Sequence, residues 1–383
     1  MNKLIVIDIF AGCGGLSLGF KKAGCDVCSH IEIDKNCCET LQENALPKER
    51  VLNVDITEYS SYLKDLKKSI PDKLDGIIGG PPCQAYSIAG RNKEENKMDK
   101  DPRNFLFESF VYLLKELKPN FFIFENVTGM LSAKPFGINI NEQIYKSFEK
   151  AGYFIRSNFK ECVFEMSDFG IPQKRKRVII FGIKKSSFKN YEEIVESFYF
   201  EMHKDKKKRK KKTVKDTIGD LPKLFPQKVI NKKSHSSSEY FSEHEPRFHN
   251  ERDIKIFSLL AKDIETGKNK YTSINALKEV YRKFTNKTSV VHKYNVLRWE
   301  QPSNLIPAHI YKDGLRHIHP DSKQARSITI RESARLMTFP DSYKLKGSRG
   351  DKYKMLGNAV PPNFSKIIAS VIKKIIYTKR KKH

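Results

Sequence analysis

The stretch KLIVIDIFAGCGGLSLGF, residues 3–20, joins a continuously apolar run to a glycine-rich turn and then to a helical pattern. Continuous rather than alternating apolarity is typical of a strand that is covered on both faces. Gly12, Gly14 and Gly15 permit a tight turn and let a ligand approach the backbone closely. The helix after them offers free N–H groups to such a ligand. The stretch therefore predicts a strand–turn–helix unit with a binding site at the turn.

The same pattern recurs along the first half of the chain, where apolar runs alternate with amphipathic stretches such as 104–117. The predicted strands are 3–10, 26–33, 50–56, 74–80, 120–126 and 176–183. Strands separated by helices predict an α/β fold with a doubly wound, mainly parallel sheet. We expect residues 1–183 to form this first domain.

After residue 183 the alternation of strands and helices disappears, and the sequence contains the lysine-rich run 206–212 and the only tryptophan, Trp299. We expect a second, smaller and irregular domain at 184–340. Near its end, Thr329 and Glu332 have the spacing of a helix capping box.

The last part of the chain, 341–383, contains a helical pattern that follows Pro361 and Pro362. Ile367, Ile368 and Val371 begin its apolar face. We expect this segment to return to the first domain.

The chain of 383 residues has 72 Lys and Arg against 45 Asp and Glu, a formal net charge of +27. Such a surplus suits a polyanionic partner, above all nucleic acid. No stretch approaches the ~20 apolar residues of a membrane span, and the apolar run at the N-terminus is too short for a signal peptide. We expect a cytoplasmic, nucleoid-associated protein without a membrane partner.

The seven cysteines are an odd number without an export signal, which predicts reduced thiols rather than disulfides. Cys25 and Cys28 form a CxxC pair near His30. No second pair stands at the spacing of zinc ligands, so we predict no metal site.

The glycine-rich turn differs from two familiar nucleotide-binding motifs. A dinucleotide motif starting at Gly12 requires glycine where Ser17 stands, and a Walker loop requires Gly-Lys-Ser/Thr. Glu32, at the end of the second predicted strand, could accept hydrogen bonds from both hydroxyls of a ribose. Asp55 ends the third, where an adenine amino group would lie. Residues that suit the ribose and the adenine, without either of these phosphate-binding motifs, indicate that the ligand is S-adenosylmethionine.

A thiol and a carboxyl follow two neighbouring predicted strands. Cys83, in GGPPCQAYSIAGR (79–91), ends the fourth strand and Glu125 ends the fifth, so both should enter one cleft. A thiolate that adds to C6 of cytosine turns C5 into a nucleophile, and an acid at N3 stabilises the charge that develops there. Arg175 and Arg177 in QKRKR would favour the thiolate.

Six ordered motifs now allow a comparison: DIFAGCGG, GGPPCQAYS, ENV, QKRKR, RESARLMTFPD and GNAVPP. In order and spacing the chain resembles DNA cytosine-5 methyltransferases of the bacterial restriction–modification type, from residue 4 to about 183 and from about 326 to 375. The resemblance implies that Cys83 is the nucleophile, that Glu125 is the acid and that Arg177 contacts the base, with Arg175 and Gln173 in support. The cofactor-lining residues that it implies are Phe10, Gly12, Gly14, Glu32, Asp55, Pro82 and Asn358.

The resemblance also implies how DNA is bound. The variable stretch 184–325 would recognise a target sequence in duplex DNA, from which the cytosine is flipped. The loop 90–103 would close over that base, and Gln84, Ser87 and Arg91 would contact the DNA. One departure is Asn304 before Leu305, where members often carry Thr. We expect a monomer whose functional counterpart is a cognate restriction endonuclease.

Two alternatives stay open on the sequence. A tRNA cytosine-5 methyltransferase would share this scaffold, and a sequence-specific DNA-binding protein without catalysis would be expected to lack Cys83 or Glu125. An amino-directed methyltransferase would need an Asp/Asn-Pro-Pro-Tyr/Phe motif in place of PPCQ. We interpret the lysine-rich run 206–212 as a solvated loop that touches phosphate or nothing.

Overall fold

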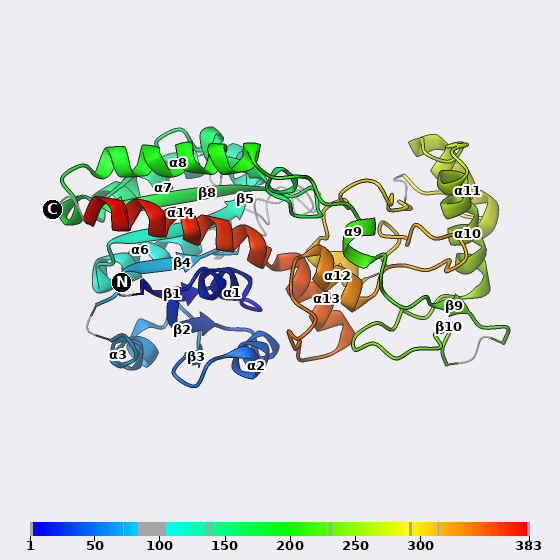
Figure 1. The fold of residues 1–383 in the computed structure, drawn as a ribbon, viewed down its shortest axis with the longest axis horizontal. Coiled ribbons are helices and arrows are strands. Elements are labelled where there is room, and N and C mark those ends of the chain that lie inside the picture. The colour runs from blue at the N-terminus through cyan, green and yellow to red at the C-terminus, as the bar shows by residue number, and fades with distance from the viewer. Residues whose placement is uncertain are drawn as a thin grey trace.

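The computed structural model describes residues 3–71, 73–82, 105–134, 137, 139–229, 232–290, 293–312 and 314–380. Two lobes lie side by side, with α12 and α13 between them (Figure 1). The sheet lobe comprises the described residues of 3–207 and 362–380, and the second lobe those of 214–358.

The sheet lobe contains eight strands. They are β1 Ile5–Ile9, β2 Asp26–Glu32, β3 Arg50–Asn53, β4 Gly76–Gly79, β5 Phe121–Val127, β6 Tyr153–Ile155, β7 Val163–Glu165 and β8 Lys176–Lys184. Its α-helices are α1 Gly15–Lys22, α2 Lys35–Asn44, α3 Tyr59–Ser69, α6 Leu106–Leu117, α7 Ile140–Lys150, α8 Tyr191–Lys207 and α14 Pro362–Arg380. Short 3-10 turns are η3 Thr128–Ser132, η5 Phe159–Cys162, η6 Met166–Phe169 and η7 Lys185–Ser187.

The strand order is β3-β2-β1-β4-β5-β8-β6, with β7 also paired to β8. From β3 to β5 all neighbours are parallel, whereas β8 runs antiparallel to β5, β6 and β7. The predicted doubly wound, mainly parallel α/β sheet is thus confirmed. The order reverses beside β1, and in open sheets of this kind ligands bind outside the carboxyl ends of the strands near that point. We call the edge where β1, β2, β4 and β5 end the carboxyl edge.

Two glycines bring α1 against the last segment of the chain. A Cβ on Gly15 would lie 2.1 Å from the Val360 carbonyl oxygen, and one on Gly19 would lie 2.3 Å from Cβ of Ser365. Only glycine permits this approach. The helix predicted after Pro361 and Pro362 is α14, which lies along α1 and α8 (Figure 1). The termini of α1 and α13 are thereby held near one another.

The second lobe has few regular elements. They are α9 Lys215–Ile218, β9 Phe225–Pro226, β10 His235–Ser236, α10 Glu251–Glu265, α11 Ile274–Thr285, η8 Ala308–Tyr311, α12 Ile330–Leu336 and α13 Arg349–Asn358. A small apolar core around Phe257, Leu260 and Tyr294 supports α10 and α11. The capping box predicted for Thr329 and Glu332 is present at the start of α12.

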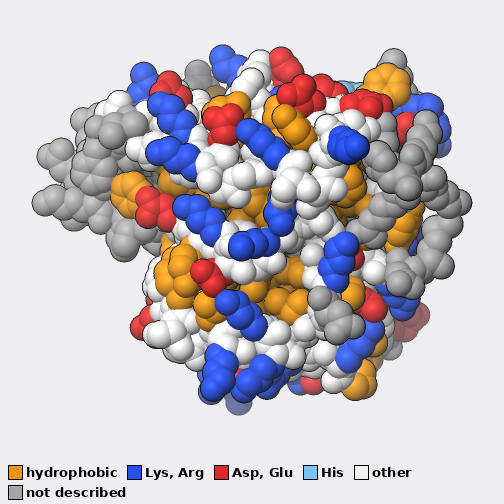
Figure 2. Space-filling model, turned by 90° about the vertical axis from the view of Figure 1, so that its left-hand side faces the viewer, with side chains coloured by type: hydrophobic (Ala, Val, Ile, Leu, Met, Phe, Trp, Pro, Cys, Tyr) orange, Lys and Arg blue, Asp and Glu red, His pale blue; other side chains and the backbone are white. Residues whose placement is uncertain are grey.

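Basic side chains are not confined to one region of the surface. Figure 2 shows the end of the sheet lobe that points away from the second lobe, and Lys and Arg are spread over much of it among fewer acidic side chains. Surface charge alone therefore does not identify the face that binds a polyanion.

Candidate active site

The glycine-rich turn after β1 lies at the carboxyl edge. Phe10 and Gly12 have φ of 54° and 52°, and Gly14 has 77°. A Cβ on Gly12 would meet no atom within 4 Å, so this residue borders open space. A Cβ on Gly14 would lie 2.8 Å from Leu41 and 2.9 Å from the Tyr343 hydroxyl. Gly14 is thus required by packing, whereas Gly12 leaves room for a ligand beside the backbone.

Glu32, at the end of β2, is bonded to this turn. Its Oε2 accepts a hydrogen bond from the Gly12 N–H at 2.7 Å, and its Oε1 accepts from the N–H groups of Ile33 and Asp34, each at 2.9 Å. Burial raises the pKa of Glu32, although these three N–H groups oppose the shift. Three of the roughly four lone-pair sites of the carboxylate are thus occupied, and the remaining one is on Oε2. The carboxylate is therefore fixed in place and can still accept from a hydroxyl group.

Ile33, which the sequence analysis did not single out, borders the Glu32 carboxylate. Its side chain is 64% exposed although it is large and apolar, and it directly follows Glu32. In the sequence the only signal was a large apolar residue directly after the acidic residue at a strand end.

Asp55 follows β3 and Asn358 ends α13. The Oδ1 of Asp55 accepts from the backbone N–H of Thr57 at 2.9 Å and from its hydroxyl at 2.7 Å, which orients the carboxylate. Asn358 is exposed and stands two residues before Val360, whose carbonyl oxygen packs against Gly15. The structure therefore brings Asn358, from the far end of the chain, to the start of α1.

A carboxyl and a guanidinium meet where β5 and β8 adjoin. Nε of Arg177 lies 2.8 Å from Oε1 of Glu125, and both residues are at most 9% exposed. In the antiparallel register Arg177 is opposite Val127, so it shares a face with Glu125 two residues earlier. A buried pair of this kind holds both side chains in one geometry.

The chain that leaves β4 passes close to this pair. A Cβ on Gly80 would lie 2.7 Å from Oε2 of Glu125, and Nδ2 of Asn126 donates to the Pro81 carbonyl oxygen at 3.5 Å. Pro82 is half-buried at the end of the described segment. The predicted residues Cys83, Gln84, Ser87 and Arg91, and the loop 90–103, lie outside the described residues.

Arg175 and Gln173 connect the lobes. The Arg175 guanidinium donates to the carbonyl oxygens of Ile306 at 3.2 Å, Gly357 at 3.1 Å and Ala359 at 2.9 Å. Burial, and then the charge of Arg177, lower the pKa of Arg175 well below its usual value. Oε1 of Gln173 accepts from the Ile306 N–H at 3.3 Å. Arg175 was predicted to support Arg177, and its own contacts join the start of β8 to the second lobe and α13.

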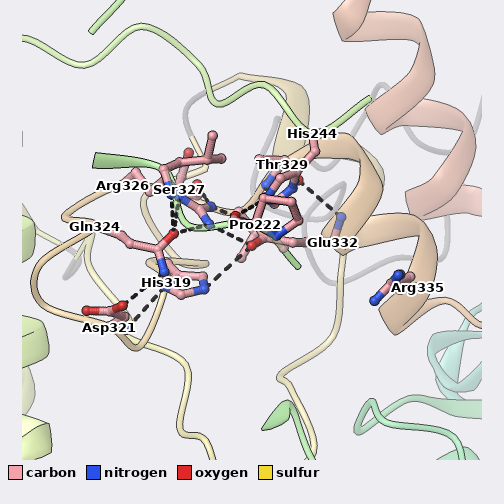
Figure 3. Close-up of polar contacts among 12 residues, drawn as sticks. Pro222, His244, His319, Asp321, Gln324, Arg326, Ser327, Thr329, Glu332 and Arg335 are labelled. Atoms are coloured by element: carbon pink, nitrogen blue, oxygen red, sulfur yellow. Dashed lines mark hydrogen bonds and ion pairs between the residues drawn. The ribbon is translucent and has the colours of Figure 1, made fainter. Parts of the chain in front are cut away.

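A second buried charge cluster, which the sequence analysis missed, holds α12 (Figure 3). Arg326 donates to both carboxylate oxygens of Glu332 at 2.7 Å, and Nε2 of His319 lies 3.5 Å from the same carboxylate. Glu332 also accepts from the Thr329 N–H at 2.7 Å. Burial would raise the pKa of Glu332, but Arg326 lowers it on balance. The motif RESARLMTFPD thus contributes a carboxylate to the internal support of the second lobe.

The described cysteines are Cys13, Cys25, Cys28, Cys37, Cys38 and Cys162, all free and buried. Burial raises the pKa of Cys25 and of Cys28 to about 11, so neither is a reactive thiol at neutral pH. Within the described part of the chain, no group of three His, Cys, Asp or Glu side chains is placed to hold a metal ion. No described helix is long and apolar enough to cross a membrane.

Comparison with known proteins places this arrangement in a family. A family model for C-5 cytosine-specific DNA methylases matches residues 4–374. The type II methyltransferase M.Bpa9945I of Bacillus paralicheniformis is 32% identical over 97% of this chain and 99% of its own length. The type II methyltransferase M.FnuDI of Fusobacterium nucleatum is also 32% identical, over 98% of this chain and 96% of its own.

Solved structures agree. A prophage-encoded DNA modification methyltransferase of E. coli matches 99% of this chain and 100% of its own, with a TM-score of 0.63 and 27% identity. The S. pombe Dnmt2 methyltransferase matches 98% of this chain and 99% of its own. With a TM-score of 0.57 and 17% identity, it shares the fold.

Proposed function

This chain belongs to the family of C-5 cytosine-specific DNA methylases, and from that premise we propose that it transfers a methyl group from S-adenosylmethionine to C5 of a cytosine in one specific sequence of duplex DNA. It is a DNA cytosine-5 methyltransferase of the restriction–modification type. The observation that carries the proposal is the buried pair of Glu125 and Arg177, which lies against Gly80 in the segment leading to Cys83.

Cys83 directly follows Pro82 and is the proposed nucleophile. Its sulfur forms a bond to C6 of the flipped cytosine, and the electron pair of the C5–C6 double bond makes C5 nucleophilic. The Glu125 carboxyl holds a proton at N3, where negative charge develops, and Arg177 orients that carboxyl and contacts the base. After C5 has gained the methyl group, loss of its proton and departure of the Cys83 thiolate restore the aromatic ring.

The carboxyl edge fits the adenosine part of the proposed cofactor. When bound, S-adenosylmethionine supplies an electrophilic methyl group on a sulfonium sulfur. Glu32 would accept a hydrogen bond from a ribose hydroxyl, Ile33 would offer apolar surface to the adenine and Asp55 would accept from its amino group. The open side of Gly12 leaves room for the ligand. The other residues proposed to line the site are Phe10, Gly14, Pro82 and Asn358.

We assign recognition of the target sequence to the stretch 184–325, most of which lies in the second lobe. The duplex would lie between the lobes, with Gln84, Ser87 and Arg91 as further DNA contacts. Methylation at the recognised site would protect the DNA of a bacterial host from a cognate restriction endonuclease. The proposed place of action is therefore the nucleoid in the cytoplasm.

Expression in a host that lacks cytosine methylation tests this function. Bisulfite sequencing should show protected cytosines within one short sequence throughout the host DNA. Cys83→Ala should abolish that protection while purified protein still binds duplex DNA. Methylation of purified tRNA but not of duplex DNA would overturn the proposed substrate, and unchanged protection with Cys83→Ala would overturn the mechanism.

A further inference from the structure

The lysine-rich run 206–212, here called the basic strap, is the part of the chain that first crosses from the sheet lobe to the second lobe. It begins at the end of α8 and leads to α9, and Figure 1 shows this crossing beside the junction of the lobes. A charged run of this kind is often a solvated segment without a fixed position. Here both of its ends are anchored.

Asp168, in η6, anchors the strap to the sheet lobe. Its carboxylate pairs with Nζ of Lys206 at 2.8 Å and with Nζ of Lys211 at 3.4 Å. Gly170 lies under the strap, because a Cβ there would be 3.3 Å from the Lys210 carbonyl oxygen. Two ion pairs from one carboxylate, together with this backbone contact, hold the strap against the loop that leads to β8.

Two backbone hydrogen bonds anchor the far end to the second lobe. The N–H of Val214 donates to the Gln301 carbonyl oxygen at 2.9 Å, and that of Lys215 donates to the Trp299 carbonyl oxygen at 3.0 Å. The strap is therefore a fixed bridge between the lobes.

The strap also lies at the carboxyl edge. The turn η6 follows β7, in which Phe164 pairs with Arg177 of β8. Asp168 is thus close in the chain to the strand that supplies the proposed base contact. A duplex that delivers a cytosine to Glu125 and Arg177 would have its backbone over this same edge.

Three basic side chains of the strap are held by carboxylates: Lys206 and Lys211 by Asp168, and Arg209 by Asp205. The alternate side chains, Lys208, Lys210 and Lys212, are exposed. On the neighbouring segment Lys174 and Lys176 are also exposed, on either side of the buried Arg175. The acidic side chains therefore pair with three basic side chains of the strap, and Lys208, Lys210 and Lys212 remain exposed to solvent.

We propose that Lys208, Lys210 and Lys212 of the basic strap bind the phosphate backbone of duplex DNA outside the bases that the enzyme reads. This inference rests on the proposed function and adds a non-specific binding surface to it. Lysines on an anchored segment position a duplex without reading its sequence. Each phosphate that a lysine neutralises releases counterions. The fall of log K with log salt concentration is therefore steeper by about 0.9 for each such phosphate.

The test compares two triple variants of the full chain. Lys208→Gln, Lys210→Gln and Lys212→Gln are combined in the strap variant. The control combines Lys64→Gln, Lys115→Gln and Lys150→Gln, which changes the same charge at exposed positions on α3, α6 and α7. Affinity for a 30-base-pair duplex of mixed sequence is measured from 50 to 200 mM KCl, and thermal unfolding confirms that both variants are folded.

The strap variant should lower the salt slope by about 2 to 3, so that wild type loses about 16- to 64-fold more affinity than the variant over this salt range. The control should keep the wild-type slope within about 0.5. Equal slopes for both variants, in a wild-type protein that binds and methylates DNA, would overturn the inference alone. A wild-type protein that does not methylate duplex DNA would instead contradict the proposed function.

Discussion

Glu332→Gln tests the buried charge cluster that supports the second lobe. Glutamine keeps the shape of the side chain and can still accept from the Thr329 N–H, so the capping box survives. The substitution removes the charge opposite Arg326, whose two hydrogen bonds to the carboxylate are 2.7 Å long. Arg326 and Glu332 are 1% and 0% exposed, so water cannot replace the lost partner.

Removal of one partner from a buried ion pair costs about 3 to 5 kcal/mol, because the other charge is left uncompensated. We therefore expect the free energy of unfolding of Glu332→Gln to fall by about that amount. Combining it with Arg326→Met removes the stranded charge and should restore most of the stability. Arg282→Gln is the control, because its pair with Glu279 is exposed and should contribute less than ~1 kcal/mol.

Urea unfolding followed by tryptophan fluorescence is the assay. Trp299 is the only tryptophan, and its ring centroid lies 5.2 Å from that of His319 beside Glu332, so the signal reports on this cluster. A loss below ~1 kcal/mol for Glu332→Gln, or a double variant less stable than the single one, would refute the reasoning.

Three further predictions concern the site and its pH dependence. Gly12→Ala should lower the free energy of unfolding by about 1 kcal/mol, because Gly12 has a φ of 52°. The alanine side chain would enter the open space beside the turn, so S-adenosylmethionine should bind at least tenfold more weakly when measured by calorimetry. Glu125→Gln should lower the single-turnover methylation rate by about 10² to 10⁴, measured at a temperature where its thermal transition shows that the variant is folded. Because it leaves the buried Arg177 without its charged partner, it should also lower the thermal midpoint of unfolding. Burial lowers the pKa of His235 and of His317 to about 4, and of His249 and of His319 to about 3, so between pH 6.5 and 4 the unfolded chain binds more protons. Stability should then fall as the pH is lowered through this window, by up to ~1.4 kcal/mol per histidine per pH unit, and equal urea midpoints at pH 7.5 and 5 would contradict this.

Much of the sheet could be predicted because buried strands have a strong local pattern. All six predicted strands are present, with bounds that shift by a few residues. The strands β6 and β7 were missed because three residues each carry too short a pattern. The apolar run of β8 did not reveal its antiparallel direction, because apolarity does not encode strand direction.

The part of the candidate site that lies at the ends of strands could be predicted from the sequence. Cys83 and Glu125 were expected in one cleft, with Arg177 on a strand close to the thiolate, and the structure places Arg177 2.8 Å from Glu125. The contacts of Arg175 with Ile306 and Ala359 span 131 and 184 residues, and no local pattern records such pairings. Arg326 is only six residues from Glu332, but it lies before α12, and this spacing is not one that brings side chains together on a helix.

The central claim is a covalent bond between Cys83 and C6 of the target cytosine. A duplex with 5-fluorocytosine at the methylated position, incubated with the enzyme and S-adenosylmethionine, blocks loss of the C5 substituent and should trap that bond. Mass spectrometry of the digested complex should find the DNA on the peptide that contains Cys83, and none with Cys83→Ala. Absence of the adduct from an enzyme that methylates ordinary DNA would contradict the account.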